Sequence, residues 1–238
     1  MKIRLVVTIL FLLTGFAVWL YRHFFRSLSL PPKPRTIEQV LVAIGPSVEG
    51  RLRPAFDRVG ATWPPRDLIL LAFKAERRLE LYASHANEKP RFVCSYPILG
   101  ASGSLGPKLR EGDKQVPEGF YRIELLNPNS RYHLSLRVNY PNADDVEHAR
   151  EEGRDLSTLG GDIMIHGGSA SIGCLAVGDT AAEELFFLAA RAGLDNIRLI
   201  IAPRDFRKSN RAAALEDAPV WTVELHKRIR TKLAEFPF

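Results

Sequence analysis

Cysteine is scarce in this chain: Cys94 and Cys174 are the only two among 238 residues. Two cysteines cannot form a disulfide framework, whatever the redox compartment. The fold must therefore rest on its hydrophobic core. With 46% apolar residues the chain can bury a sizeable core in one domain with extensions, which excludes disorder as the default. A thiol that is not needed in a disulfide can then act as a reactive group.

Long blocks of like charge are also missing. Lys and Arg number 33 against 27 Asp and Glu, a net charge of +6 that is spread along the chain. The pattern does not indicate a nucleic-acid tail, and it suits an anionic membrane surface or an anionic polymer equally well. The six histidines show no ligand spacing with the cysteines or acids, so neither a metal site nor a cofactor is expected.

One uncharged apolar run, Leu5–Tyr21, stands near the N-terminus between positively charged residues. Its length approaches the ~20 residues that span a bilayer, which indicates a signal or an anchor over residues 1–26. Gly15-Phe16-Ala17 fits a cleavage site only loosely, because the apolar run continues beyond it. An uncleaved anchor in the inner membrane is favoured, with a cleaved signal or a buried helix as alternatives.

The region after this run has the pattern of a mainly β domain with flanking helices (α+β). A proline-rich spacer over residues 27–35 comes first. Residues 36–59 then show helical spacing that Gly45-Pro46 interrupts, which predicts two short helices. Strands of a mainly antiparallel sheet are predicted at residues 68–73, 79–83, 92–98, 119–126 and 131–138. Further strands are predicted at residues 163–165 and 196–202.

Two helices are predicted in the C-terminal part. Thr180-Ala181-Ala182-Glu183 has the spacing of a capping box that opens a helix, and Gly193 closes it. Trp221, Leu225, Ile229 and Leu233 form one helical stripe. Residues 36–206 are therefore assigned to the main domain, and residues 207–238 to a helical extension that packs on it.

Polar residues alternate along one predicted strand. His133, Ser135 and Arg137 alternate with apolar residues, which places the three on one face of the sheet. They are candidates for a substrate groove, with Tyr140 at its rim. The alternatives are a solvated strand face and, at Tyr140, ordinary turn chemistry.

The strongest chemical signal is His166-Gly-Gly-Ser-Ala-Ser171-Ile-Gly173-Cys174. A cysteine attacks as thiolate, and a neighbouring imidazole can take its proton. Backbone N–H groups of Gly173 and Cys174 could face an oxyanion, and Ser171 could add a hydroxyl. The alternative is a buried structural cysteine and a structurally bonded histidine.

A wider set of motifs accompanies this pair. They are Tyr96-Pro97-Ile98, Ala101-Ser102-Gly103, Gly106-Pro107-Lys108, Glu111-Gly112-Asp113, Val116-Pro117-Glu118-Gly119-Phe120-Tyr121, Asn127-Pro128, Ser130, Asn139-Tyr140-Pro141-Asn142, His166-Gly167 and Ser171-Ile172-Gly173-Cys174. With these, the chain resembles the L,D-transpeptidase (YkuD-type) catalytic family over roughly Gly45 to Arg204. The resemblance is to its branch of murein L,D-transpeptidase-like proteins in Gram-negative envelopes.

This resemblance implies a β-sandwich-like domain with the cysteine at the end of a groove. It implies that Cys174 is the nucleophile, His166 the base and the Gly167 carbonyl the group that orients the imidazole. The implied substrates are peptidoglycan stem peptides, cleaved at the L-centre of diaminopimelate through an acyl-enzyme, in cell wall biogenesis and cell shape. The implied place is the periplasmic face of the inner membrane.

The sequence departs from the commoner family pattern: Ile172 stands where a second histidine is usual, the loop is shorter, and no Arg or Asn closely follows the cysteine. Two alternatives to transpeptidation therefore stay open. One is a hydrolase that releases a murein-linked lipoprotein, and the other is a peptidoglycan-binding module without turnover.

Overall fold

The computed structural model describes residues 16, 19–21, 33–84, 88–208 and 218–236. The chain divides into two compact units, Met1–Pro34 and Arg35–Phe238. Most of the predicted anchor and spacer lies outside the described residues. Within the described ranges, no helix is long and apolar enough to cross a membrane.

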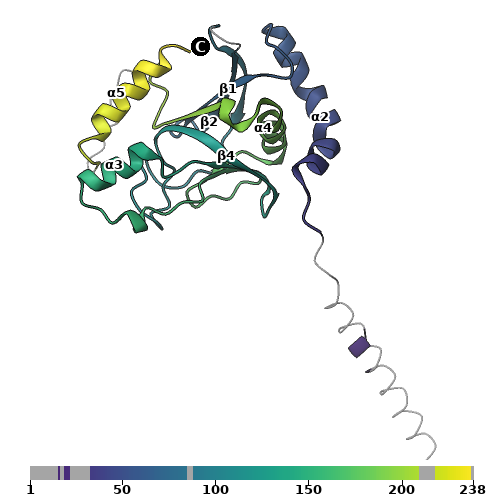
Figure 1. The fold of residues 1–238 in the computed structure, drawn as a ribbon, viewed down its shortest axis with the longest axis horizontal. Helices are drawn as coiled ribbons and strands as arrows, with labels where there is room; N and C mark the ends of the chain where they lie inside the picture. The colour runs from purple at the N-terminus through teal and green to yellow at the C-terminus, as the bar shows by residue number, and fades with distance from the viewer. Residues whose placement is uncertain (1–15, 17–18, 22–32, 85–87, 209–217, 237–238) are drawn as a thin grey trace, which may run out of the picture. The chain divides into compact units, whose positions relative to one another are not determined.

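The second unit is built on one eight-stranded sheet (Figure 1). In spatial order the strands are β3 (Arg91–Pro97), β2 (Arg78–Ser84), β1 (Asp67–Phe73), β8 (Ile197–Ala202), β4 (Gly119–Ser130), β5 (His133–Val138), β6 (Met164–His166) and β7 (Leu175–Ala176). Pairing is parallel between β1 and β8 and between β6 and β7, and antiparallel elsewhere. The predicted mainly antiparallel, mainly β domain with flanking helices is confirmed. The β-sandwich-like form that the resemblance implies is not seen, because all eight strands belong to one sheet and helices cover its two faces. The two-residue β7 was not predicted, because so short a strand leaves no periodic pattern.

Helices cover both faces of this sheet (Figure 1). Helices α2 (Ile37–Arg58) and α4 (Asp179–Ala192) pack on one face, and α5 (Thr222–Leu233) packs on the other. Strand β1 shows why both faces are apolar. Leu68, Leu70 and Ala72 belong to the core under α2 and α4, whereas Ile69, Leu71 and Phe73 belong to the core under α5. A strand buried on both faces reads as a continuous apolar run.

The prediction of two helices within residues 36–59 is wrong, because α2 is one continuous helix that contains Pro46. Thr36 opens it with a capping box to Gln39. Gly45 lets α2 approach α4 closely, since a Cβ there would lie 3.3 Å from the Phe187 ring. The buried stripe continues past the proline to Phe56. Packing against α4 and the sheet therefore outweighs the local helix-breaking preference.

The predicted capping box at Thr180–Glu183 is also wrong. Helix α4 begins at Asp179, and its N-cap, Gly178, makes no side-chain capping bond. Glu183 instead forms an ion pair with Arg51 and a hydrogen bond with His133. The end of α4 at Gly193, in a positive-φ conformation, agrees with the prediction.

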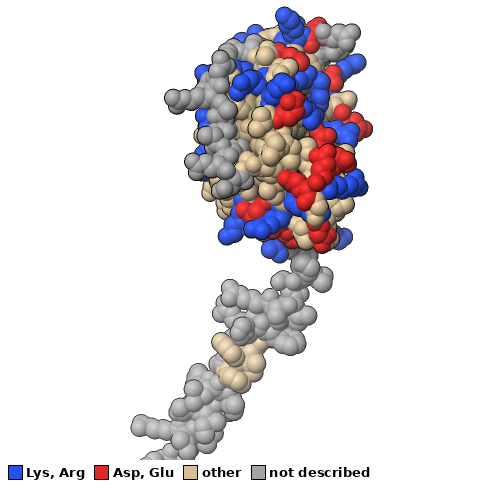
Figure 2. Space-filling view, turned by 90° about the vertical axis from the view of Figure 1, so that its left-hand side faces the viewer, with Lys and Arg blue, Asp and Glu red and all other residues tan. Residues whose placement is uncertain are grey.

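The C-terminal stripe is confirmed. Leu225, Ile229 and Leu233 of α5 are buried against the sheet, and Trp221 packs beside them. Helix α3 (Ala143–Glu151) was not predicted, although Asn142 and Asp145 form a capping box at its start. Figure 2 views the side of the molecule that carries α5 and shows both signs of charge interspersed over it. The net positive charge is not gathered into one basic patch on that face.

Candidate active site

The pairing of β6 with β7 brings the two ends of the His166–Cys174 loop together. Ile165 lies opposite Leu175 and His166 opposite Ala176 in parallel register. Continuing that register by one residue places Cys174 beside Met164 on the neighbouring strand. Because Met164 comes two residues before His166, the side chains of Cys174 and His166 lie on the same side of the sheet. At strand spacings of ~4.8 Å and ~3.3 Å per residue, the two Cα atoms are then roughly 8 Å apart, within joint reach of an imidazole and a thiol.

Both residues open into one cavity of about 590 Å³. Its walls come from β6, from the segment just before it, from the loop between His166 and Cys174, from the turn between β4 and β5, and from the loop before β4. The lining residues are Lys108, Glu111, Gly112, Lys114, Ser130, Tyr132, Gly161, Asp162, Ile163, Met164, His166, Ala170, Ser171, Ile172 and Cys174. This size is that of a site for part of a peptide or a small molecule.

Two contacts hold the imidazole of His166. Its Nδ1 lies 2.6 Å from the carbonyl oxygen of Gly167, so the Nδ1–H donates to that oxygen and Nε2 carries the lone pair. This is the contact that the family resemblance implies for Gly167. The ring of Tyr132 lies over the imidazole, with centroids 4.6 Å apart and the planes tilted by 30°. Burial lowers the pKa of His166 below its ordinary value, and the bond to Gly167 offsets part of this effect.

The thiol of Cys174 is half-buried, with Sγ 3.7 Å from the carbonyl oxygen of Asp162. Burial raises the pKa of Cys174 above its ordinary value. The backbone N–H of Met164 acts against this shift, the Asp162 carboxylate adds to it, and the Lys108 ammonium acts against it. With the cysteine pKa raised and the histidine pKa lowered, both groups are neutral near pH 7. This arrangement suits proton transfer during attack and does not suit a preformed ion pair.

The loop between the two residues is held by its own polar groups. Ser171 Oγ donates to the Cys174 carbonyl at 2.7 Å, and the Gly173 N–H donates to Ser171 Oγ at 3.3 Å. The structure thus places the Ser171 hydroxyl and the Gly173 N–H, two of the predicted oxyanion donors, in contacts within the loop. Gly173 has a φ of 125°, where any side chain is strained. A Cβ at Gly167 would collide with a carboxylate oxygen of Asp179 and with the Tyr132 carbonyl.

A buried lysine, Lys108, also lines the cavity. Lys108 donates to Asp113 Oδ1 at 2.6 Å and to the Arg110 carbonyl at 2.7 Å, and it lies over the Tyr140 ring. Asp113 also accepts the backbone N–H groups of Leu109, Arg110 and Gln115. One carboxylate therefore holds this wall and its cation in place.

None of the four predicted substrate-binding residues lines the cavity. The φ of 72° at His133 takes it out of strand alternation, and its Nε2 lies 3.0 Å from Glu183 on α4. The three polar residues of β5 therefore do not act as one face. Ser135 is buried opposite His166, and Arg137 forms ion pairs with Glu124 and Asp162.

Tyr140 is buried as well, and its hydroxyl donates to the carbonyls of Lys108 and Leu159. Its hydrogen bond to the Lys108 carbonyl supports a segment of the cavity wall, and Tyr140 does not form the rim of the cavity. Contact between substrate and any of the four predicted residues stays a prediction.

Sequence reasoning missed two residues that shape the site. Tyr132 was placed inside the predicted strand 131–138 and not recognised as a site residue, whereas in the structure it lies in the turn before β5. Asp179 accepts the Gly168 N–H at 2.8 Å and so connects the loop between His166 and Cys174 to the start of α4. In the described part of the chain, no group of three or more His, Cys, Asp or Glu residues could hold a metal ion.

Comparisons with known proteins show which family the chain resembles. The L,D-transpeptidase catalytic domain (YkuD) family model matches residues 69–194, just over half of the chain. The curated protein "Putative L,D-transpeptidase YafK" of Escherichia coli K12 is 41% identical over 116 residues, and the same figures hold for its counterpart in strain O157:H7. That match covers 48% of this chain and 44% of the relative, so it spans less than half of the relative's length.

Solved structures with a related backbone include the helical cell shape determining protein Pgp2 of Campylobacter jejuni, at 21% identity and a TM-score of 0.44. The alignment covers 65% of this chain and 56% of Pgp2. Bd1075 of Bdellovibrio bacteriovorus aligns at 21% identity and a TM-score of 0.43, over 72% of this chain and 55% of Bd1075. By the family match over residues 69–194, this chain belongs to the YkuD L,D-transpeptidase catalytic family.

Proposed function

We propose that this chain is a peptidoglycan L,D-transpeptidase-type acyltransferase that uses Cys174 as its nucleophile and His166 as its general base. The observation that carries the proposal is the shared cavity, which both residues line while Gly167 holds Nδ1 of the imidazole. That bond leaves the lone pair of Nε2 free to accept the thiol proton.

In the proposed reaction, the Cys174 thiol gives its proton to Nε2 of His166 as Sγ bonds to the carbonyl carbon at the L-centre of diaminopimelate. The carbonyl π electrons move to oxygen, and the backbone N–H of Cys174 faces the resulting oxyanion. Collapse breaks the C–N bond to the D-residue, whose amine leaves with the proton from Nε2. An acceptor amine then attacks the thioester, gives its proton to the imidazole and releases the thiol.

The cavity walls suit such a substrate. Lys114 lines the cavity, and its ammonium can bind a carboxylate of a stem peptide, whereas Lys108 is already paired with Asp113. Tyr132 and Ile172 are 48% and 79% exposed at the same cavity and offer apolar surface to the peptide's aliphatic parts. Diaminopimelate offers both a charged and an apolar part, because the carboxylate at its D-centre stands at the end of an aliphatic side chain.

The test is incubation of the full chain with purified disaccharide tetrapeptide, followed by mass spectrometry. A Cys174→Ala variant should form no product, and Cys94→Ala, which removes the other thiol, should react like the unaltered chain. A cross-linked dimer with loss of the terminal D-residue indicates transfer, and free tripeptide indicates hydrolysis. Turnover by Cys174→Ala at the unaltered rate would refute the proposal.

We place this activity on the periplasmic side of the inner membrane, because the proposed substrate is found outside that membrane. The apolar run Leu5–Tyr21 is the feature that supports an attachment there. Fractionation of cells that produce the full chain should recover it with the inner membrane. A chain lacking residues 1–26 should stay in the cytosol.

A further inference from the structure

The peptide group between Gly167 and Gly168 is held at both of its ends. Its carbonyl oxygen accepts the Nδ1–H of His166 at 2.6 Å, and its N–H donates to Oδ1 of Asp179 at 2.8 Å. A trans peptide group is planar, and its C=O and N–H bonds point in opposite directions. The side chain of Asp179 therefore holds one end of the group whose other end orients the imidazole.

Glycine on both sides makes this peptide group easy to rotate. A glycine has no Cβ, so the dihedral angles next to the peptide are only weakly restricted. Gly168 has a φ of 68°, and the approach of Asp179 leaves no room for a Cβ at Gly167. The chain itself does not fix the direction of the Gly167 carbonyl. A bond from outside this turn is needed to keep that carbonyl aimed at His166.

The other backbone bonds of the turn hold the peptide groups before and after this one. They run from the N–H of Gly167 to the Leu134 carbonyl at 3.2 Å, from the N–H of Val177 to the His166 carbonyl at 2.9 Å and from the N–H of Gly178 to the Gly168 carbonyl at 3.0 Å. None of these bonds involves the carbonyl of Gly167 or the N–H of Gly168. Among the described residues, Asp179 is therefore the partner that holds the Gly167–Gly168 peptide on its N–H side.

Asp179 belongs to an element whose position does not depend on the site. It begins α4, which is packed into the core through Ala182, Leu185 and Phe186, each at most 2% exposed. Asp179 itself is exposed. A substitution there removes the bond to Gly168 without opening the core, so the domain should still fold.

We propose that Asp179 is a positioning residue for the general base. Its hydrogen bond to the Gly168 N–H fixes the Gly167 carbonyl, and this carbonyl holds His166 in the tautomer with the proton on Nδ1 and the lone pair on Nε2. The effect on turnover rests on the proposed function. The effect on the tautomer does not, because the tautomer can be measured without substrate.

The tautomer is measured by ¹⁵N NMR of the full chain labelled at histidine, at pH 8, where the chemical shifts of the two ring nitrogens report which one carries the proton. The signals of His166 are those that disappear in His166→Gln. The unaltered chain should show the Nδ1–H form. Asp179→Ala should show a mixture of both tautomers, whereas Asp179→Asn, which keeps an oxygen that can accept the Gly168 N–H, should retain the Nδ1–H form.

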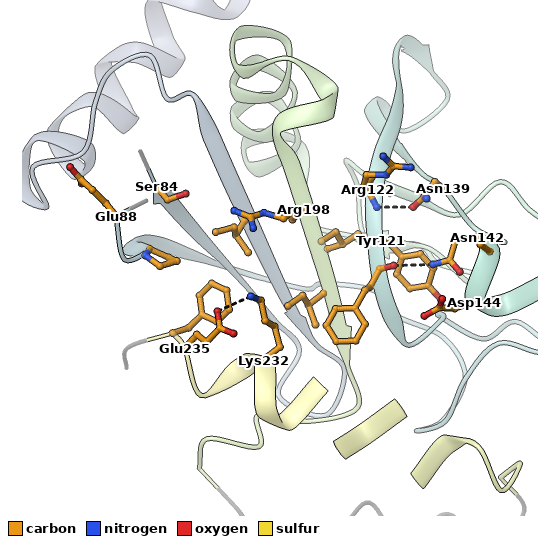
Figure 3. Close-up of a pocket in the computed structure, with 17 residues that line it drawn as sticks. Ser84, Glu88, Tyr121, Arg122, Asn139, Asn142, Asp144, Arg198, Lys232 and Glu235 are labelled. Atoms are coloured by element: carbon orange, nitrogen blue, oxygen red, sulfur yellow. Dashed lines mark hydrogen bonds and ion pairs between the residues drawn. The ribbon is translucent and has the colours of Figure 1, made fainter. Parts of the chain in front are cut away.

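Asp144→Ala is the matched control, because it also removes an exposed carboxylate from the first turn of a helix, α3. Asp144 lines a cavity under α5 that shares no residue with the cavity of Cys174 (Figure 3). The tautomer and the kcat of this variant should match those of the unaltered chain. A shift of the tautomer in Asp144→Ala as large as in Asp179→Ala would overturn the proposal.

With disaccharide tetrapeptide as substrate, Asp179→Ala should lower kcat roughly tenfold, the factor that a hydrogen bond to a charged group contributes. KM should change less than about twofold, since Asp179 does not line the cavity. Asp179→Asn should keep more of the kcat than Asp179→Ala. An unchanged tautomer in Asp179→Ala, or equal losses in the alanine and asparagine variants, would overturn the proposal. If the unaltered chain turns over no peptide, the proposed function fails, and the NMR measurement still decides the role of Asp179.

Discussion

Replacement of Glu118 by alanine is expected to remove a large part of the stability of this domain. Glu118 is buried, and its Oε1 lies 2.9 Å from Lys74 Nζ while its Oε2 lies 2.8 Å from His226 Nε2. Oε1 also accepts the Gly106 N–H at 2.7 Å. One carboxylate thus joins the end of β1, the loop that forms a wall of the catalytic cavity, and helix α5.

The magnitude follows from what the substitution leaves behind. Lys74 has a side chain that is 4% exposed, so its ammonium would stay in the core without a counter-charge. Removing one partner of a buried ion pair costs about 3–5 kcal/mol. The orphaned Gly106 N–H adds a penalty of about 1–3 kcal/mol that overlaps with the first. A total loss of about 3–5 kcal/mol in the free energy of unfolding is therefore expected.

Urea unfolding of the full chain, followed by circular dichroism, measures this loss. At a slope of about 2 kcal/mol per molar urea, the midpoint should fall by roughly 2 M. Glu224→Ala is the matched control, because Glu224 lies on α5 in an ion pair with Lys227 whose side chains are 64% and 74% exposed. It should cost no more than about 1 kcal/mol. A loss of less than about 1 kcal/mol for Glu118→Ala would refute the reasoning.

The same carboxylate predicts how stability depends on pH. Burial by itself would raise the pKa of Glu118, but the bonds from His226, Lys74 and Gly106 outweigh it and hold that pKa below its ordinary value. A lowered carboxyl pKa gives stability that is present above the unfolded-state pKa and is lost as the pH falls through the folded one. The unaltered chain should therefore lose its advantage over Glu118→Ala as the solution becomes acidic, below about pH 4.5.

Three further outcomes are expected. Tyr132→Ala should lower kcat two- to tenfold, because the contact between the two rings contributes about 0.5–1.5 kcal/mol to holding the imidazole of His166. Tyr132→Phe keeps the ring and should keep the kcat of the unaltered chain. Equal losses of kcat in the two variants would contradict the role of the ring. Because the pKa of His166 is lowered, kcat/KM should stay constant from neutral pH to below pH 6.5 and should fall only as the imidazole becomes protonated. A decrease in kcat/KM that begins above pH 7 would contradict the lowered pKa. Iodoacetamide at pH 8 should label Cys174 first by peptide mapping, because burial raises the pKa of Cys94 to about 11, and faster labelling of Cys94 would contradict that assignment.

Local patterns in the sequence were enough for the strands other than β7, for the C-terminal helix and for the central motif of the site. Alternation and apolar runs report burial of neighbouring residues, which is why β1 and β8 could be located before their pairing was known. The short loop from His166 to Cys174 likewise carries its chemistry in consecutive residues. The role of the Gly167 carbonyl as the partner of His166 Nδ1 came from the family resemblance and not from a local pattern.

Only the tertiary structure decided which distant residues meet. The continuity of α2 through Pro46 depends on its packing against Phe187, and the ring of Tyr132 reaches His166 only because β5 pairs with β6. Asp179 reaches Gly168 because β7, which leads into α4, pairs with β6. Strand order and register are set by the burial of whole faces, and that balance of packing is not contained in any short stretch of sequence.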